Sequence, residues 1–244
     1  GLVVGDAAIP TANGLMPGYF ARLEGVKNPP VVLVAMEIFG LHEYVRDVAR
    51  RLAKLGALAV APDYYFHSGA DVPAMKEIGA IMPIVNAKPD AELIADLDAT
   101  VAWAKAQGGD VDRLGVIGFC RGGRTVWLYC SESSAPKAGV AFYGTLIDPP
   151  QQKAIWSKSP MDLAPELKAP VLGLYGGADQ GIPVAVVEEM KARLAAAGKT
   201  AEFHVYADAP HGFHADYRPS YREAAAEDAW RRMTEWLRRF GVLP

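Results

Sequence analysis

Short apolar runs alternate with longer amphipathic segments along most of this chain. Most of the runs are continuous rather than alternating, which is typical of strands that are buried on both faces of a parallel sheet. Runs of this kind predict strands at residues 31–36, 57–61, 114–119, 140–143, 171–175 and 202–206. A further strand is predicted at residues 16–23, after a turn at residues 10–14.

The segments between these runs carry apolar residues at helical spacing. In residues 42–55 they are Val45, Val48, Ala49 and Leu52. The same reasoning predicts helices at residues 42–55, 91–106, 122–130, 183–197 and 220–240. Because strands and helices alternate, we expect an α/β fold with a mainly parallel sheet and helices on both faces.

Two segments do not follow the alternation. Residues 63–90 contain several prolines and the aromatic residues Tyr64 and Tyr65, and we interpret them as a partly helical cover over the functional site. Residues 145–168 are predicted to be an irregular excursion. No internal repeat or linker interrupts the pattern, so we predict one domain over residues 1–244.

Composition narrows the range of functions. The 25 Lys and Arg residues against 28 Asp and Glu residues give a net charge of −3 with no basic stripe, which argues against nucleic acid as a partner. No apolar run has membrane-spanning length, and no zinc-binding motif occurs. We therefore expect a monomer or small homo-oligomer that acts on a small molecule without a metal or other cofactor. The chain begins at Gly1, so a removed export signal is an alternative to the cytoplasmic location that we expect.

The candidate nucleophile is Cys120. It lies in the pattern Gly118-x-Cys120-x-Gly122, which joins a predicted strand to a predicted helix. This is the nucleophile elbow of α/β-hydrolases with Cys in place of Ser. In such a turn the central residue is strained, and side chains two positions away on either side would collide, hence the glycines. The alternative is that Cys120 is a buried packing residue.

Three further reactive side chains are predicted at the same edge of the sheet as Cys120. Glu37, Asp179 and His211 each follow the carboxyl end of a predicted strand, the edge where open parallel sheets bind ligands. The order of nucleophile, acid and histidine is that of α/β-hydrolases. His211 would take the thiol proton of Cys120, and Asp179 would orient the imidazole. The backbone N–H groups of Ile38 and Arg121 are placed to form an oxyanion hole.

Other residues compete for these roles. Asp208 is an alternative acid because it lies close to His211, and His214 is a second choice for the base. His42, His67 and His204 fit surface or strand positions better than catalytic ones. The second cysteine, Cys130, lies along the predicted elbow helix, and we expect it to be buried and inert.

Several motifs together give the chain a specific resemblance. They are Glu37-Ile38-Phe39-Gly40-Leu41, Pro62-Asp63, Gly118-Phe119-Cys120-Arg121-Gly122-Gly123, Phe142-Tyr143-Gly144, Gly176-Gly177-Ala178-Asp179 and His211-Gly212-Phe213. From about residue 5 to 240, the chain resembles the dienelactone hydrolase (carboxymethylenebutenolidase) family of α/β-hydrolases. The resemblance implies that Cys120, Asp179 and His211 form the triad. It also implies that the Glu37 carboxylate holds the resting thiol; bonding of Glu37 to backbone amides or to Arg121 is the alternative.

The chain departs from this family in its substrate anchors. Family members that act on dienelactone have one arginine soon after the Pro-Asp box and another four residues beyond the histidine. Here the first region has only Tyr64, Tyr65, Phe66 and His67, and Ala215 stands four residues beyond His211. An anionic lactone therefore lacks its bidentate anchor.

These departures favour a more apolar pocket than the family's. We predict that the substrate-binding residues are Tyr64, Tyr65, Tyr143 and Arg218, while Trp127 fits either this pocket or the core. The function predicted from the sequence is that of a cysteine-dependent ester or lactone hydrolase. A thioester or peptide hydrolase on the same fold and a non-catalytic small-ligand binding module remain the alternatives.

Overall fold

A single eight-stranded sheet organises the fold. The computed structural model describes residues 1–244. The strand order is β1-β2-β4-β3-β5-β6-β7-β8. The strands are β1 (Leu2–Thr11), β2 (Gly14–Leu23), β3 (Pro30–Ala35), β4 (Leu58–Pro62), β5 (Asp110–Phe119), β6 (Ala138–Phe142), β7 (Val171–Gly176) and β8 (Ala201–Tyr206). β1 and β2 form an antiparallel hairpin, β2 pairs antiparallel with β4, and all other pairs are parallel.

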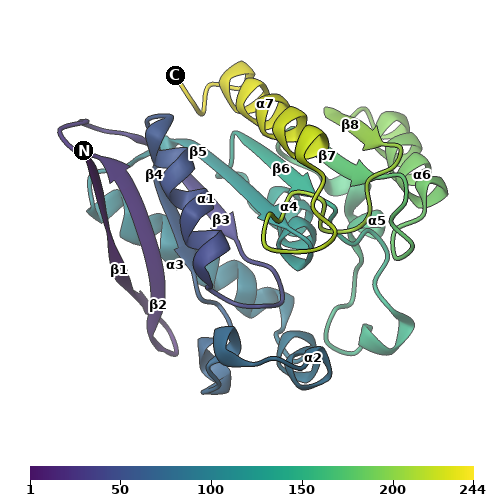
Figure 1. Cartoon of the computed structure of the whole chain (residues 1–244), viewed down its shortest axis with the longest axis horizontal. Helices are drawn as coiled ribbons and strands as arrows, with labels where there is room; N and C mark the ends of the chain where they lie inside the picture. The colour runs from purple at the N-terminus through teal and green to yellow at the C-terminus, as the bar shows by residue number, and fades with distance from the viewer.

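Helices cover both faces of this sheet. They are α1 (Glu43–Lys54), α2 (Ile78–Asn86), α3 (Asp90–Ala106), α4 (Arg121–Glu132), α5 (Pro160–Leu163), α6 (Val184–Ala196) and α7 (Glu223–Arg239). In the view of Figure 1, α1 and α7 lie in front of the sheet and α3 and α4 lie behind it. The predicted α/β-hydrolase architecture is confirmed. None of the helices is both long and apolar enough to cross a membrane.

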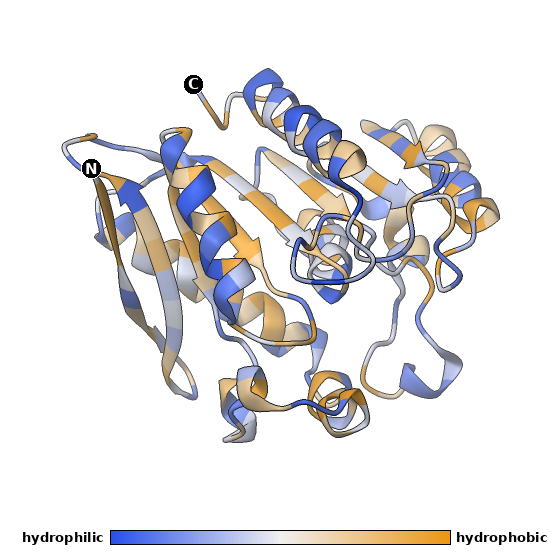
Figure 2. Cartoon of the chain, in the orientation of Figure 1, coloured by the Kyte–Doolittle hydropathy of each residue, from blue (hydrophilic) through white to orange (hydrophobic).

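Burial explains why the strands could be predicted. Every residue of β3, β4, β6 and β7 is buried, as expected for continuous apolar runs between two helical layers. Figure 2 shows these central strands largely in orange, whereas α1 and α7 present blue polar faces to the outside. The β1–β2 hairpin alternates between buried and exposed residues over much of its length, because only one of its faces meets the core.

Some boundaries differ from the prediction. β5 begins at Asp110, four residues earlier than expected, because its first residues are partly exposed and lack the apolar signal. The last helix begins at Glu223, since residues 211–222 form a loop in which the Arg222 N–H donates to the Phe213 carbonyl. The cover at residues 63–90 is partly helical as predicted: it holds two 3₁₀ turns, Phe66–Ser68 and Val72–Ala74, and α2.

The cover and the excursion after β6 are joined by one tryptophan. The excursion carries the 3₁₀ turns Pro150–Gln152 and Ala164–Glu166 and the short helix α5. Trp156 is buried, and its indole N–H donates to the Lys88 carbonyl of the cover at 2.8 Å. The Trp156 ring lies under the guanidinium groups of Arg121 and Arg124, at 4.6 and 4.3 Å from its centroid. Both segments are thereby held against α4.

Candidate active site

The turn from β5 into α4 has the geometry of a nucleophile elbow. Cys120 has φ 58° and ψ −115°, a left-handed backbone that a side chain rarely adopts. A Cβ atom at Gly118 would lie 2.1 Å from the Gly122 carbonyl oxygen, and one at Gly122 would lie 2.1 Å from the Ala35 carbonyl oxygen. No other residue type fits either position without moving the backbone. The steric reason for both glycines is therefore the one predicted from the sequence.

Cys120, His211 and Asp179 form a continuous chain of contacts. His211 Nε2 lies 3.1 Å from the Cys120 sulfur, and His211 Nδ1 lies 2.7 Å from Asp179 Oδ2. The other Asp179 oxygen accepts the backbone N–H groups of Gly181 and Ile182 at 2.9 and 3.2 Å. The Asp179 side chain is 1% exposed and that of His211 31% exposed, so the acid is held inside while the base reaches the surface.

The electrostatics of His211 follow from these contacts. Burial disfavours the charged imidazolium, but the hydrogen bonds to Asp179 and Cys120 outweigh it and raise the pKa of His211 to about 10. A protonated His211 is the counter-charge that a thiolate at Cys120 needs. The sulfur and imidazole are thus arranged to share one proton.

Two backbone donors stand free beside the elbow. The N–H groups of Ile38, just after β3, and of Arg121, the first residue of α4, donate no hydrogen bond within the protein. The N–H at a helix start has no partner inside its own helix and carries the positive end of the helix dipole. These are the two donors that the sequence assigned to an oxyanion hole.

Glu37 does not hold the thiol in this structure. Its carboxylate is fully buried, and its Oε2 atom accepts the Tyr217 hydroxyl at 2.7 Å and pairs with His42 Nε2 at 3.2 Å. The resting hydrogen bond to Cys120 that the family resemblance implied is replaced by the contact between Cys120 and His211. The alternative, in which backbone amides or Arg121 bind Glu37, is not seen either.

Comparisons with known proteins agree on one family. Residues 16–241 match the dienelactone hydrolase family. The chain belongs to the dienelactone hydrolase family. This makes it a hydrolase of the carboxymethylenebutenolidase-like, carboxylic-ester-hydrolase type.

Individual relatives cover nearly the whole chain. A protein of Methylorubrum extorquens, named "Putative carboxymethylenebutenolidase", is 51% identical over 99% of this chain and 83% of its own length. A Bradyrhizobium sp. protein, named "Probable 2-oxo-3-(5-oxofuran-2-ylidene)propanoate lactonase", is 33% identical over 90% of this chain and 88% of its own length. A crystal structure titled "Putative Dienelactone Hydrolase", from Klebsiella pneumoniae, superposes with a TM-score of 0.94 at 44% identity, covering 98% of this chain and 99% of the other.

In this dienelactone hydrolase family member, the predicted substrate-binding residues lie in different surroundings. The Tyr64 side chain is buried, and its hydroxyl donates to the Met36 carbonyl at 2.9 Å. Tyr143 is also fully buried, with its ring edge-to-face against His211 at 5.1 Å. Tyr143 is therefore packed against His211, whereas Tyr64 also lines the cavity under the cover. Trp127 belongs to the core because its N–H donates to the Tyr175 hydroxyl at 3.0 Å.

Tyr65 and Arg218 are the other two predicted substrate-binding residues. Tyr65 and Tyr64 both line a cavity of about 230 Å³ under the cover, together with Lys88 and Glu92, and Cys120 is not among the residues that line it. The guanidinium of Arg218 lies 5.6 Å from the centre of the Phe39 ring and packs against Gly212, next to His211. No acidic side chain pairs with it. Arg218 thus stays a substrate-binding prediction with suitable geometry.

None of the competing residues makes a hydrogen bond with the Cys120 sulfur. Asp208 is exposed and makes no side-chain hydrogen bond. His214 is buried and bonds the Tyr44 hydroxyl at 2.6 Å, and burial lowers its pKa to about 3. Cys130 is fully buried, and this burial raises the pKa of its thiol. His204 lies on β8 and His67 on the cover.

Sequence reasoning missed two residues of the site, Tyr217 and His42. Both bind Glu37, and their rings meet edge-to-face at 5.1 Å. The signal for Tyr217 was weak: it follows His211 by six residues on a loop that no periodicity describes. His42 follows Glu37 by five residues and was interpreted as a surface residue at the start of a helix.

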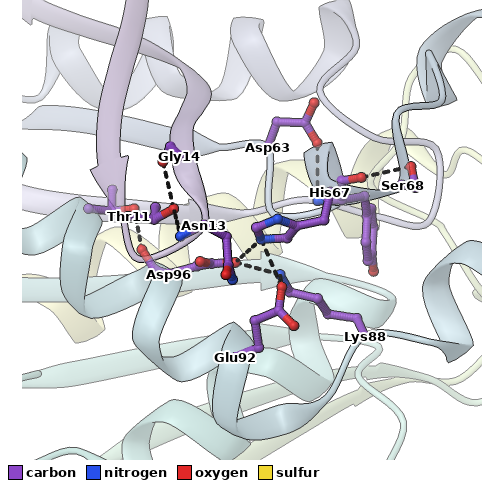
Figure 3. A network of polar contacts seen from close by, with 11 residues as sticks. Thr11, Asn13, Gly14, Asp63, His67, Ser68, Lys88, Glu92 and Asp96 are labelled. Carbon is purple, nitrogen blue, oxygen red and sulfur yellow. Dashed lines mark hydrogen bonds and ion pairs between the residues drawn. The ribbon is translucent and has the colours of Figure 1, made fainter.

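A cluster under the cover has the composition of a metal site. His67, Glu92 and Asp96 place one ligand atom each within 4.8 Å of one another. Figure 3 shows, however, that the Lys88 ammonium points into the same group. Lys88 Nζ lies 2.9 Å from Glu92 Oε1 and 2.5 Å from Asp96 Oδ2, where it provides the positive charge that these carboxylates need. The donor set therefore fits an ion cluster that fastens the cover to α3 better than it fits a cation site.

Proposed function

We propose that this protein hydrolyses a small ester or lactone through an acyl-enzyme on Cys120. The observation that carries the proposal is the unbroken alignment of the Cys120 sulfur, the His211 imidazole and the Asp179 carboxylate, at 3.1 and 2.7 Å. Binding alone requires no such alignment. Nucleophilic catalysis requires each of the three groups in that order.

The chemistry follows from the positions of these groups. The Cys120 thiolate attacks the carbonyl carbon of the substrate, and His211 holds the thiol proton. The oxyanion that forms accepts hydrogen bonds from the free N–H groups of Ile38 and Arg121. As the C–O bond breaks, His211 gives its proton to the leaving alkoxide. In a lactone the alkoxide remains tethered to the acyl group.

In deacylation a proton moves from water to His211 and then to the sulfur. His211, now neutral, takes a proton from water as the water oxygen attacks the thioester carbon. The tetrahedral intermediate collapses, the C–S bond breaks, and the carboxylic acid product leaves while the imidazole returns the proton to the sulfur. Asp179 stabilises the imidazolium at both stages and keeps Nδ1 protonated.

The position of Arg218 favours a substrate with a polar or acidic substituent. Its guanidinium stands beside Gly212 without an acidic partner, and the Phe39 ring offers an apolar surface next to it. The lactonase name of the Bradyrhizobium relative agrees with a lactone substrate. One arginine gives a weaker grip on a carboxylate than a pair does, so we propose a small, mainly apolar ester or lactone.

The test is active-site chemistry with a matched pair of cysteine variants. Wild type mixed with a p-nitrophenyl ester is expected to release a burst of p-nitrophenol, and prior iodoacetamide is expected to abolish it. Cys120→Ala should lose at least about 10²-fold in turnover, while Cys130→Ala should keep it. Peptide mapping after brief alkylation should find the label on Cys120.

Two results would contradict this assignment. One is a burst that survives in Cys120→Ala, and the other is label on Cys130 while hydrolysis continues. Parallel assays with acyl-thioesters and peptides test the other reaction classes that the fold permits. A higher kcat/KM on either of these than on esters would replace the proposed substrate class.

A further inference from the structure

Tyr143 lies in a turn that contacts both Cys120 and His211. It directly follows β6, and the carbonyl of its neighbour Phe142 accepts the Cys120 N–H at 3.0 Å. The Tyr143 ring meets the His211 imidazole edge-to-face, with 5.1 Å between the ring centres. The Tyr143 N–H donates to the Leu174 carbonyl of β7 at 2.7 Å. The turn therefore links the sheet to both members of the Cys120–His211 pair.

The backbone of this turn is strained and tightly confined. Tyr143 has φ 37°, in the left-handed region that a residue with a side chain rarely adopts. A Cβ atom at the next residue, Gly144, would lie 2.4 Å from the Gly123 carbonyl carbon in the first turn of α4. Strain of this kind persists only where the surrounding structure imposes it. The contacts around the turn thus impose the conformation that places the Tyr143 ring against His211.

The ring of Tyr143, rather than its hydroxyl, makes these contacts. The side chain is fully buried, and its hydroxyl has no hydrogen-bond partner. A buried tyrosine hydroxyl normally has one, because its lost hydration is otherwise uncompensated. The ring, in contrast, also meets the Phe213 ring edge-to-face, with 5.2 Å between the ring centres. Tyr143 therefore fits a role of packing against the imidazole better than a role of binding a substrate.

The imidazole needs such a support at one stage of the proposed reaction. In the free protein, Asp179 holds Nδ1 of His211, and the Cys120 sulfur lies at Nε2. In an acyl-enzyme the sulfur carries the acyl group and has no proton to share, so the contact at Nε2 is lost. The torsion that turns an imidazole on its Cβ atom has broad minima, and one hydrogen bond at Nδ1 leaves the ring free to tilt. The His211 side chain is 31% exposed, so the loops alone do not enclose it.

We propose that Tyr143 is a positioning residue that keeps the His211 imidazole in place for the attacking water after Cys120 has been acylated. The inference rests on the function proposed above, because it assigns Tyr143 to the deacylation step. Acylation depends less on Tyr143, since the sulfur itself lies at Nε2 at that stage. In deacylation a tilted imidazole would hold the water away from the thioester carbon, and a small error in position lowers the rate of such a step strongly.

Pre-steady-state kinetics on a p-nitrophenyl ester separate the two steps. Tyr143→Leu removes the aromatic ring and keeps an apolar side chain. We expect kcat to fall about tenfold, because deacylation is slowed. The burst rate constant and kcat/KM, which report acylation, should change less than about threefold. Tyr143→Phe keeps the ring and should therefore restore kcat to within about twofold of wild type.

Tyr129→Leu is the matched control. Tyr129 is a fully buried tyrosine on α4, and its hydroxyl bonds Asp98 at 2.7 Å rather than any residue of the triad. The control should lower the midpoint of thermal unfolding, as Tyr143→Leu does, and leave both kinetic phases unchanged. If Tyr143→Leu slows the burst and the steady state equally, or if Tyr129→Leu reproduces its effect, the ring acts through stability alone and the inference is wrong. A fall in kcat/KM without a fall in kcat would assign Tyr143 to the substrate and would overturn the inference as well.

A measurement without turnover separates this inference from the proposed function. If wild type hydrolyses no ester, the proposed function fails, and Tyr143 is tested in Cys120→Ala, where His211 lacks the sulfur as it does in an acyl-enzyme. The His211 Nδ1 proton, which is bonded to Asp179, gives a downfield proton NMR signal while the imidazole stays in place. This signal should remain in Cys120→Ala and disappear by exchange with water when Tyr143→Leu is added. A signal that is absent from Cys120→Ala, or that persists in the double variant, overturns the inference.

Discussion

At the scale of single residues, His211 shows how burial and partners compete. Burial alone would keep its imidazole neutral, yet the hydrogen bonds to Asp179 and Cys120 raise its pKa to about 10. Asp179 can play this part because its two oxygens have three N–H donors, from Gly181, Ile182 and His211. The acid is thus fixed in place before the imidazole meets it.

Replacing this acid tests its role directly. Asp179→Asn should lower kcat/KM for an activated ester by at least about 10²-fold, because the amide favours the wrong imidazole tautomer and cannot stabilise the imidazolium. The unfolding midpoint in urea shows whether the fold is kept. Asp208→Asn is the control, since Asp208 is exposed and bonds nothing. If Asp208→Asn proved the more damaging of the two, the acid would have to be reassigned.

The residues that could be predicted are those whose role follows from strand ends. Cys120, Asp179 and His211 each stand directly after a strand or a few residues beyond it, and the sheet brings them together whatever the loops do. The partners of Glu37 could not be predicted in this way. Tyr217 lies on an irregular loop, and its contact with Glu37 spans 180 positions of the chain. Tyr143 and Tyr64 are buried, and the sequence could not predict this because aromatic residues serve equally in pockets and in cores.

At the scale of elements, α4 is the helix to which the segments around the site are attached. Arg124 on this helix is 2% exposed and binds Asp148 of the excursion through two hydrogen bonds at 2.7 and 2.8 Å. It also binds Asp90, the first residue of α3, through two at 2.9 and 3.0 Å. One side chain therefore joins three segments that sequence patterning treats as separate.

Breaking this junction should be costly. Arg124→Met leaves the Asp148 carboxylate buried without its partner, and we expect the free energy of unfolding to fall by about 3–5 kcal/mol. Urea denaturation measures the change. Arg193→Met on α6 is the control, because Arg193 makes an exposed ion pair with Glu189 that is worth less than about 1 kcal/mol. Equal losses in the two variants would show that the buried pairs of Arg124 contribute no more than a surface pair.

The elements themselves could be predicted where local sequence decides them. Continuous apolar runs marked β3, β4, β6 and β7, because those strands are buried on both faces. The excursion after β6 could not be described from its sequence. Its path depends on distant contacts, above all the bond from the Trp156 indole to the Lys88 carbonyl, and a local pattern carries no trace of these.

At the scale of the whole molecule, a buried histidine couples the stability of the fold to pH. His214 is 2% exposed, stacks on the rings of Phe119 and Trp230, and bonds the Tyr44 hydroxyl. Burial, aided by the positive charge of Arg51, lowers its pKa to about 3, whereas in the unfolded chain it is about 6.5. Between these two pKa values His214 is protonated in the unfolded state and neutral in the folded state. Stability from this group is complete above pH 6.5 and is lost as the pH falls toward 3.

His214→Gln should remove this dependence. Gln does not titrate and can still accept the Tyr44 hydroxyl, so the variant is expected to be less stable at pH 7 but to lose less stability on acidification. From pH 6 to pH 4 the gap between wild type and variant should narrow by about 1.4 kcal/mol per pH unit, as followed by urea unfolding. His211 has the opposite linkage, because its raised pKa favours the folded state at low pH, but it titrates in both proteins and cancels in the difference. A gap that stayed constant over this range would mean that His214 takes up its proton in the folded state, and that the aromatic cluster around it does not exclude the charge.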